Sequence, residues 1–203
     1  MDLYQIAESR RFLGREFLVW VWFESELFEG ELTATGQDPF ELHLEKQITL
    51  EAGQKDKETS VLKGMQPSHT PEAREALRQG KTPTRARIRI NRAEQEFTFS
   101  LSTDALSLSG VKIPALLKEE GDEPFYERIG LIEDLEALIE ALYADFLALR
   151  VSTSWPKSVH PLMMRWIAGE TDLDVEADRQ VRDAAIHSGR QRREARRLRS
   201  AAE

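Results

Sequence analysis

The densest run of hydrophobic positions lies near the start of the chain, at residues 17–23, where seven consecutive apolar side chains include four aromatic ones. The residues before this run are mostly polar, and the residues after it are acidic. Apolar side chains fall on nearly every side of the run, so it must be covered from more than one direction. We predict a long helix over residues 2–28 with its second half buried. A buried strand is the alternative, because a short apolar run fits both.

Apolar and polar residues alternate in three later stretches, 40–51, 84–91 and 94–101, which is typical of strands with one buried face. Within the first stretch, only Lys46 breaks the alternation. Two more strands are predicted at 59–62 and 106–113.

The second and third alternating stretches predict a hairpin with a tight turn near residues 92–93. This register places Ile88 opposite Phe97 and Arg89 opposite Glu96, and both pairs are favourable across strands.

Helical patterns occupy the rest of the chain. Thr70 caps a short helix that ends at Gly80 and has little apolar surface, so we expect it to lie on the outside. Residues 124–150 have one continuous apolar stripe and predict a long amphipathic helix. Ser154 is the expected cap of a further helix that ends at Gly169.

These elements predict an α+β fold. An antiparallel sheet of about five strands is covered by the long N-terminal helix and by the two C-terminal helices. We assign residues 1–170 to one globular domain. Apolar content falls sharply in residues 171–203, so we expect a charged, arginine-rich tail that cannot bury enough surface to order itself.

Charge is unevenly distributed along the chain. The net charge of the whole protein is −8, yet residues 186–203 contain six arginines and only two glutamates, which leaves a strongly acidic body. The chain has no cysteine, which excludes disulfides, thiolate catalysis and cysteine-bound metal, and fits a reducing compartment. The longest apolar run is far shorter than the roughly 20 residues of a membrane helix, and no leader is apparent. We therefore expect a cytoplasmic protein that does not bind membranes.

No motif with catalytic spacing is present. The four histidines, at positions 43, 69, 160 and 187, lie in separate predicted elements without a second ligand at metal-binding spacing. A glycine-rich phosphate loop and a nucleophile elbow are also missing from the sequence. We expect no metal, no cofactor and no enzyme activity. Catalysis would require distant residues to converge, which a sequence does not show.

Two groups of arginines are candidates for nucleic-acid binding. In the hairpin, period-two spacing places guanidinium groups about 6–7 Å apart on one strand face, close to the phosphate repeat of a DNA strand. Cross-strand pairing with Glu96 and neighbouring acids is the alternative role for these side chains. The hairpin group is Arg85, Arg87, Arg89 and Arg92.

The second group forms a basic arm that would contact phosphates without reading sequence. Folding against the acidic body, or solubility alone, is the alternative. Its members are Arg190, Arg192, Arg193, Arg196, Arg197 and Arg199.

Three segments resemble the family of the recombination-associated protein RdgC. Residues 12–26 read Phe-Leu-Gly-Arg-Glu-Phe-Leu-Val-Trp-Val-Trp-Phe-Glu-Ser-Glu, residues 108–117 form a second similar patch, and the aromatic and acidic helix that follows is the third. The similarity covers roughly residues 11–168. The residues that match are mainly apolar or turn-forming, so they transfer a fold rather than DNA contacts. They are Phe17, Trp20, Trp22, Gly110 and Pro114.

This resemblance implies non-sequence-specific binding of duplex DNA, ring-shaped dimers around it, a role in DNA recombination through antagonism of RecA-type strand exchange, and no enzyme activity. Two features depart from the family pattern: the body is strongly acidic, and the chain lacks the family's N-terminal portion. The resulting hypothesis is a non-catalytic, RdgC-like nucleic-acid-binding protein. The alternative is a protein–protein interaction module, including a homodimer, with an acidic body and a basic accessory tail.

Overall fold

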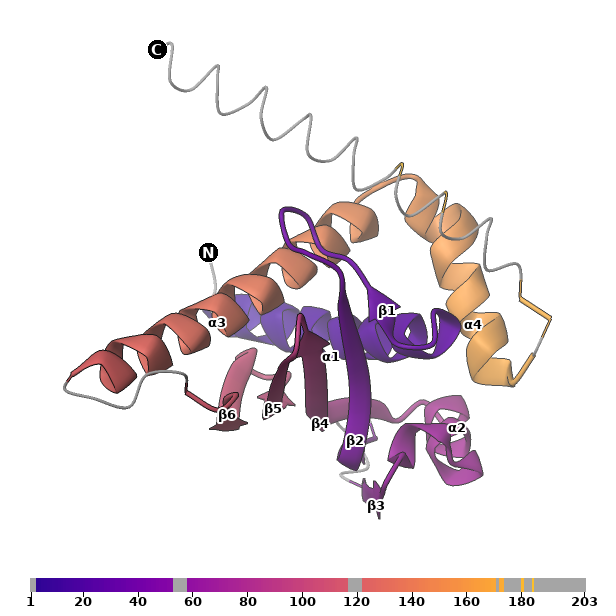
Figure 1. Ribbon diagram of the computed structural model, residues 1–203. Coiled ribbons are helices and arrows are strands. Elements are labelled where there is room, and N and C mark those ends of the chain that lie inside the picture. The colour runs from indigo at the N-terminus through magenta and orange to yellow at the C-terminus, as the bar shows by residue number, and fades with distance from the viewer. Residues whose placement is uncertain are drawn as a thin grey trace, which may run out of the picture.

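The computed structural model describes residues 3–52, 58–116, 122–170, 172–173, 180 and 184 (Figure 1). The predicted α+β fold is confirmed. The helices are α1 (Leu3–Leu27), α2 (Pro71–Arg78), α3 (Glu123–Arg150) and α4 (His160–Ala168), with a 3-10 turn η1 (Pro67–His69) before α2 and a π-helical turn η2 (Trp155–Val159) before α4. The strands are β1 (Glu31–Leu32), β2 (Phe40–Glu51), β3 (Thr59–Gly64), β4 (Thr82–Arg92), β5 (Gln95–Ser102) and β6 (Ser107–Lys112).

All the strands pair antiparallel in one six-stranded sheet. The order is β1-β2-β4-β5-β6, and β3 pairs with the second half of β2 on the same side as β1. Helix α1 packs against β2 and β4, and α3 and α4 pack against α1. The sheet therefore has one face covered by helices and an outer face that carries the polar residues of the strands (Figure 1).

The apolar run at residues 17–23 is the second half of α1, so the helix prediction is confirmed and the strand alternative is wrong. All seven side chains are buried. The ring of Phe17 contacts Tyr143 and Phe146 of α3, while Trp22 and Phe23 contact Trp166 of α4 edge to face. This one segment therefore joins the sheet to both C-terminal helices.

A buried carboxylate joins three helices at the end of α1. Glu26 accepts hydrogen bonds from the indole nitrogens of Trp22, at 2.8 Å, and Trp166, at 2.9 Å. It also forms an ion pair with Arg74 of α2, at 2.8 Å, and its side chain is only 7% exposed. Because a buried charge is tolerated only when it is paired and hydrogen-bonded, these partners fix the positions of α2 and α4 relative to α1.

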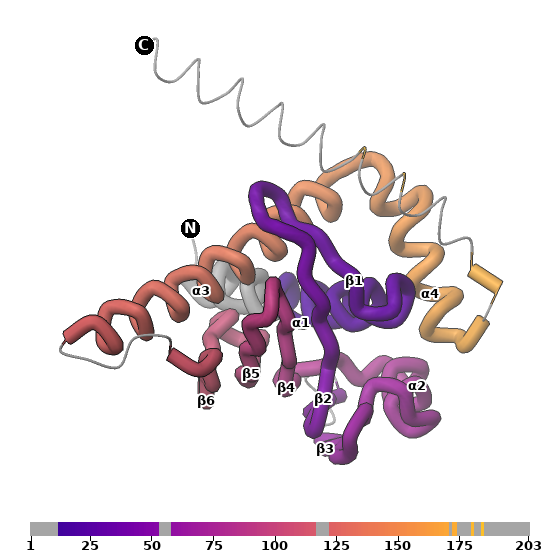
Figure 2. The backbone as a smooth tube through the Cα atoms, viewed as in Figure 1, coloured from indigo at the N-terminus to yellow at the C-terminus, as the bar shows by residue number. Residues whose placement is uncertain are grey.

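The loop between β1 and β2 is held in the same way. Asp145 of α3 is buried and accepts hydrogen bonds from the backbone nitrogen and the hydroxyl of Thr35, at 2.7 and 2.8 Å. Figure 2 shows this loop rising from the sheet beside α3. The loop is therefore positioned by a contact between residues far apart in the sequence.

Lys46 breaks the strand alternation because it lies in a β-bulge. Its φ angle is +62°, and the register of β2 against β4 shifts between Leu44 and Ile48. Two additional residues of β2 fall at this shift, so the even-numbered positions on both sides of it still face the core. The alternation seen in the sequence therefore continues through the bulge.

The predicted register of the β4–β5 hairpin is wrong by two residues. Ala93 and Glu94 both have positive φ angles, 46° and 70°, and form a two-residue turn, one position later than predicted. Moving a turn by one residue moves every cross-strand pair by two. The observed pairs are Ile88 with Phe99, Arg89 with Thr98, Ile90 with Phe97 and Asn91 with Glu96.

The predicted helix ends are confirmed in part. Thr70 caps α2 by accepting a hydrogen bond from the nitrogen of Ala73, and Gly169 ends α4 with a φ of 86°. The side chain of Ser154 makes no capping hydrogen bond, because the chain enters α4 through the π-helical turn. Helix α2 lies at the surface, but one face is buried at Ala73, Ala76 and Leu77.

Neither α1 nor α3, nor any other helix within the described residues, has an apolar stretch long enough to cross a lipid bilayer.

Truncation of Phe17 tests how far stability depends on the buried half of α1. Phe17 is fully buried, whereas Phe12 on the same helix is 58% exposed. We expect Phe17→Ala to lower the free energy of unfolding by about 3–5 kcal/mol. The matched control Phe12→Ala should change it by less than about 0.5 kcal/mol. Urea unfolding followed by tryptophan fluorescence measures both, and equal losses would contradict this account of the core.

Candidate nucleic-acid interface

The register of the sheet brings polar side chains of β2, β4, β5 and β6 together on the outer face. Alternation places Arg85, Arg87 and Arg89 of β4 on this face, since Ala86, Ile88 and Ile90 are buried. Directly paired positions share a face. The rows across the sheet are Thr49, Arg85, Ser102 and Ser107; then Arg87, Ser100 and Ser109; then His43, Arg89, Thr98 and Lys112; and Glu41, Asn91 and Glu96.

Arg85 and Arg87 both lean across β5 toward β6. Arg85 Nη2 donates to Ser109 Oγ at 3.0 Å, and Arg87 Nη1 donates to the carbonyl oxygen of Gly110 at 2.9 Å. Gly110 has a φ of +58° and lies at an irregularity in the β5–β6 register, which turns its carbonyl toward the outer face. Each guanidinium is thereby oriented by one neutral acceptor, and its remaining N–H groups stay available to another ligand.

No carboxylate of the described residues neutralises the positive charge of this pair. Within the described part of the chain, neither Arg85 nor Arg87 forms an ion pair. Sequence reasoning missed two lysines that add to the same surface, Lys112 of β6 and Lys63 of β3, both exposed. Their positions opposite Thr98 and Gln47 place them on the outer face, but only the strand pairing reveals this. We call Lys63, Arg85, Arg87 and Lys112 the basic sheet surface.

Arg89 does not contribute free charge. Its Nε lies 2.6 Å from Glu45 Oε1, and its Nη1 lies 3.9 Å from Glu96 Oε2. The alternative of cross-strand pairing with acids therefore describes Arg89. For Arg85 and Arg87 it finds no acidic partner among the described residues.

Arg92 belongs to a different part of the molecule. It lies five residues beyond Arg87 on β4, about 17 Å along the strand, and its Nη1 donates to Gln37 Oε1 at 3.1 Å. Together with three glutamates it borders an open cavity of about 630 Å³. The residues that line this cavity are Phe28, Glu31, Leu32, Thr33, Pro39, Phe40, Glu41, Asn91, Arg92, Ala93 and Glu94. The surroundings of Arg92 are therefore acidic.

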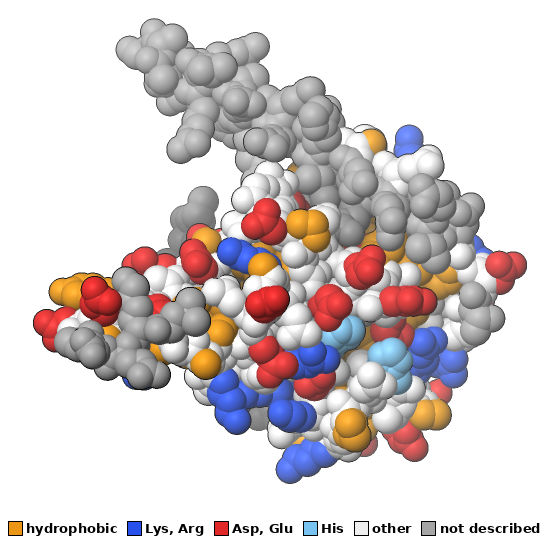
Figure 3. All heavy atoms as spheres, in the orientation of Figure 1, with side chains coloured by type: hydrophobic (Ala, Val, Ile, Leu, Met, Phe, Trp, Pro, Cys, Tyr) orange, Lys and Arg blue, Asp and Glu red, His pale blue; other side chains and the backbone are white. Residues whose placement is uncertain are grey.

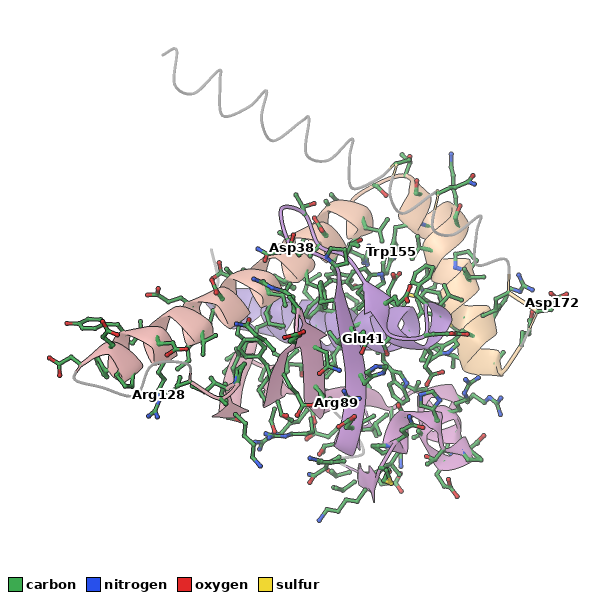
Figure 4. All side chains as sticks on the ribbon, in the orientation of Figure 1. Asp38, Glu41, Arg89, Arg128, Trp155 and Asp172 are labelled. Atoms are coloured by element: carbon green, nitrogen blue, oxygen red, sulfur yellow. The ribbon has the colours of Figure 1, made fainter. Side chains whose placement is uncertain are left out.

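The outer face is thus divided into a basic and an acidic half along the strands. Figure 3 shows blue side chains over the lower part of the strands and red side chains above them. Figure 4 labels Glu41 near the start of β2, above Arg89. An extended polyanion would be attracted to one half of this face and repelled by the other.

His43 lies where the two halves meet. Partial burial lowers the pKa of its imidazole below the ordinary value of 6.5, and the positive charge of Arg89 lowers this pKa further. Glu41 and Glu45 oppose that shift, and His69 adds slightly to it. Within the described residues, no three histidine or carboxylate side chains are grouped closely enough to hold a metal ion.

The six tail arginines lie outside the described residues. Arg190, Arg192, Arg193, Arg196, Arg197 and Arg199 therefore stay a sequence-based prediction, as does the predicted tail over residues 171–203.

No protein-family model matches the chain, and no curated protein matches it. The resemblance to the RdgC family therefore also stays a prediction.

Acidification tests the environment of His43. Because its pKa is lower in the folded state, the unfolded chain binds the proton more readily, and stability falls as the pH drops through the unfolded value near 6.5. Between about pH 8 and about pH 5.5, we expect the free energy of unfolding to fall less in His43→Gln than in the unchanged protein. Urea unfolding of both proteins measures it. NMR titration should give a His43 pKa below 6.5 that rises in Arg89→Gln, and an unchanged value would refute the contribution of Arg89.

Proposed function

We propose that this protein binds the phosphate backbone of nucleic acid, without reading base sequence, on the basic sheet surface. The observation that carries the proposal is the pair Arg85 and Arg87. Both guanidiniums are oriented by neutral acceptors on β6, and neither is paired with an acid in the described part of the chain. A structural role for an arginine on an acidic protein usually includes a carboxylate partner, as Arg89 and Arg74 have.

The geometry of the surface suits a phosphate chain. Two residues along β4 separate Arg85 and Arg87 by about 7 Å, which is close to the spacing of successive phosphates. Lys63 and Lys112 lie on the two outer strands of the sheet, four strand spacings apart, or about 19 Å. The hydroxyls of Ser100, Ser102, Ser107 and Ser109 lie between these charges and are suitable donors to phosphate oxygens.

The surface offers little for base recognition. Phosphate contacts by lysine, arginine and serine position a nucleic acid but carry no sequence information. In the rows that contain Arg85 and Arg87, no aromatic side chain stands on the outer face for a base to stack on. The expected binding is therefore non-specific and strongly dependent on salt.

The sequence supplies two further supports. The resemblance to the RdgC family implies non-specific binding of duplex DNA and a role in recombination, and the arginines of residues 190–199 would add phosphate contacts. The acidic half of the outer face argues for a short contact rather than an extended one, since it repels a backbone that continues along β4.

The test is fluorescence anisotropy of a labelled DNA duplex titrated with protein at several salt concentrations. We expect Arg85→Gln/Arg87→Gln to weaken binding roughly 10- to 100-fold and to reduce the slope of log K against log salt by about 0.9 per lost contact. Arg128→Gln is the matched control, because Arg128 is exposed and lies on α3 rather than on a strand of the sheet (Figure 4).

A second comparison separates the surface from the tail. A chain ending at residue 186 should keep part of the binding and should still respond to Arg85→Gln/Arg87→Gln. Loss of all binding on truncation would place the site on the tail arginines. The proposal would be refuted if Arg85→Gln/Arg87→Gln and the unmutated protein, both full-length, bound DNA with the same affinity and the same salt slope.

A further inference from the structure

Helix α3 presents an exposed stripe that no other described element covers. Tyr126 is 68% exposed and Ile129 is 37% exposed, and Glu133, Glu136 and Glu140 are also exposed. These residues follow one another at spacings of three and four, so they lie on one side of the helix. We call them the acidic–aromatic stripe. The opposite side of α3 is buried at Leu131, Leu135, Leu138 and Leu142.

The first part of the stripe, Tyr126 and Ile129, forms an apolar surface at the tip of α3 together with the neighbouring Phe125. Phe125 is 62% exposed, and its ring meets that of Tyr126 edge to face at 5.7 Å. Figure 1 shows the first turns of α3 extending beyond β6, and Figure 3 shows orange and red side chains together at that tip. Two exposed aromatic rings beside an isoleucine, with no role in the core, are typical of a contact surface.

The second part determines the chemistry of the partner. Glu133 and Glu136 are three residues apart, and Glu136 and Glu140 are four apart, so each pair places like charges next to each other and weakens the helix slightly. None of the three forms an ion pair within the described part of the chain. A cationic partner would remove this repulsion. A nucleic acid or an anionic membrane would add to it.

Among cationic partners, the chain itself contains a suitable segment. We infer that the acidic–aromatic stripe binds the arginine-rich segment 190–199 of the same chain. That segment has six arginines and one glutamate in ten residues, and four of the arginines recur at helical spacing: Arg192, Arg193, Arg196 and Arg197. Arginine pairs with carboxylates and also stacks on aromatic faces, so one residue type satisfies both parts of the stripe.

The chain between Leu173 and the arginine segment is longer, when extended, than helix α3. Sixteen residues lie between Leu173 and Arg190, and a chain of this length spans up to about 55–60 Å when extended. Helix α3 has 28 residues, and its length is about 42 Å. A symmetric contact between two stripes of neighbouring copies is disfavoured, because it would bring the same glutamates together.

The test of this inference contains no nucleic acid, so its outcome is separate from the outcome of the test of nucleic-acid binding. The chain has no cysteine, so two introduced cysteines form a unique pair. Ala137 is exposed within the stripe, and Ala195 lies in the middle of the arginine segment. In the matched control, the first cysteine stands at position 65 instead of position 137. Met65 is 89% exposed and lies just after β3.

We expect the full chain with Ala137→Cys and Ala195→Cys to form an intramolecular disulfide about tenfold or more faster than the chain with Met65→Cys and Ala195→Cys. The difference should disappear near 1 M salt, where charges are screened within about 3 Å. It should also disappear when Glu133, Glu136 and Glu140 are all changed to Gln. The same change at Glu31, Glu72 and Glu94, which are exposed elsewhere, should preserve it.

Three results would overturn the inference. The first is equal disulfide rates for the two pairs, and the second is a rate difference that neither salt nor the glutamine variants change. The third is crosslinking between mixed, singly substituted chains that is as fast as crosslinking within the doubly substituted chain. The last result would assign the stripe to another molecule. Circular dichroism melting of the triple glutamine variant shows that the helix is intact, because removing like-charge repulsion should not lower its melting temperature.

Discussion

The structure depends on the burial of the second half of α1 between the sheet and the C-terminal helices. Residues 17–23 are apolar on every side because every side is covered: β2 and β4 lie on one, α3 and α4 on the others. Burial of each large side chain contributes about 1.5–3 kcal/mol. The rings of Phe17 and Trp20 meet Phe146, and Trp22 meets Trp166, so this helix also fixes where the C-terminal helices lie.

Carboxylates in this acidic protein have three different roles. Glu26 and Asp145 are buried and hold helices and a loop in place through several donors each. Glu45 neutralises Arg89 on the outer face of the sheet. Within the part of the chain that the structure describes, the glutamates of the stripe on α3 have neither role, and we propose that their charge attracts a cationic partner. The net charge of the whole chain therefore does not show that the protein has two surfaces of opposite sign, a basic one on the sheet and an acidic one on α3.

The sequence by itself determined the helices and strands, and which residues of each strand share a face. Alternation placed Arg85, Arg87 and Arg89 on one face, and the absence of a polar side in residues 17–23 indicated a buried helix. Both conclusions depend only on the local repeat of the chain, 2 residues for a strand and about 3.6 for a helix. The resemblance to the RdgC family and the arginines of the tail predict nucleic acid as the class of ligand, but they indicate no position on a surface.

Only the tertiary structure decided which arginines keep a free charge. A turn one residue later than expected moved every pair of the hairpin by two, and Glu45, which is 44 positions away from Arg89 in the sequence, became its partner. Strand order likewise brought Lys63 and Lys112 onto the basic sheet surface and placed Arg92 among glutamates. Register and strand order are set by turn geometry and by packing between distant segments, and neither leaves a periodic signal in the sequence.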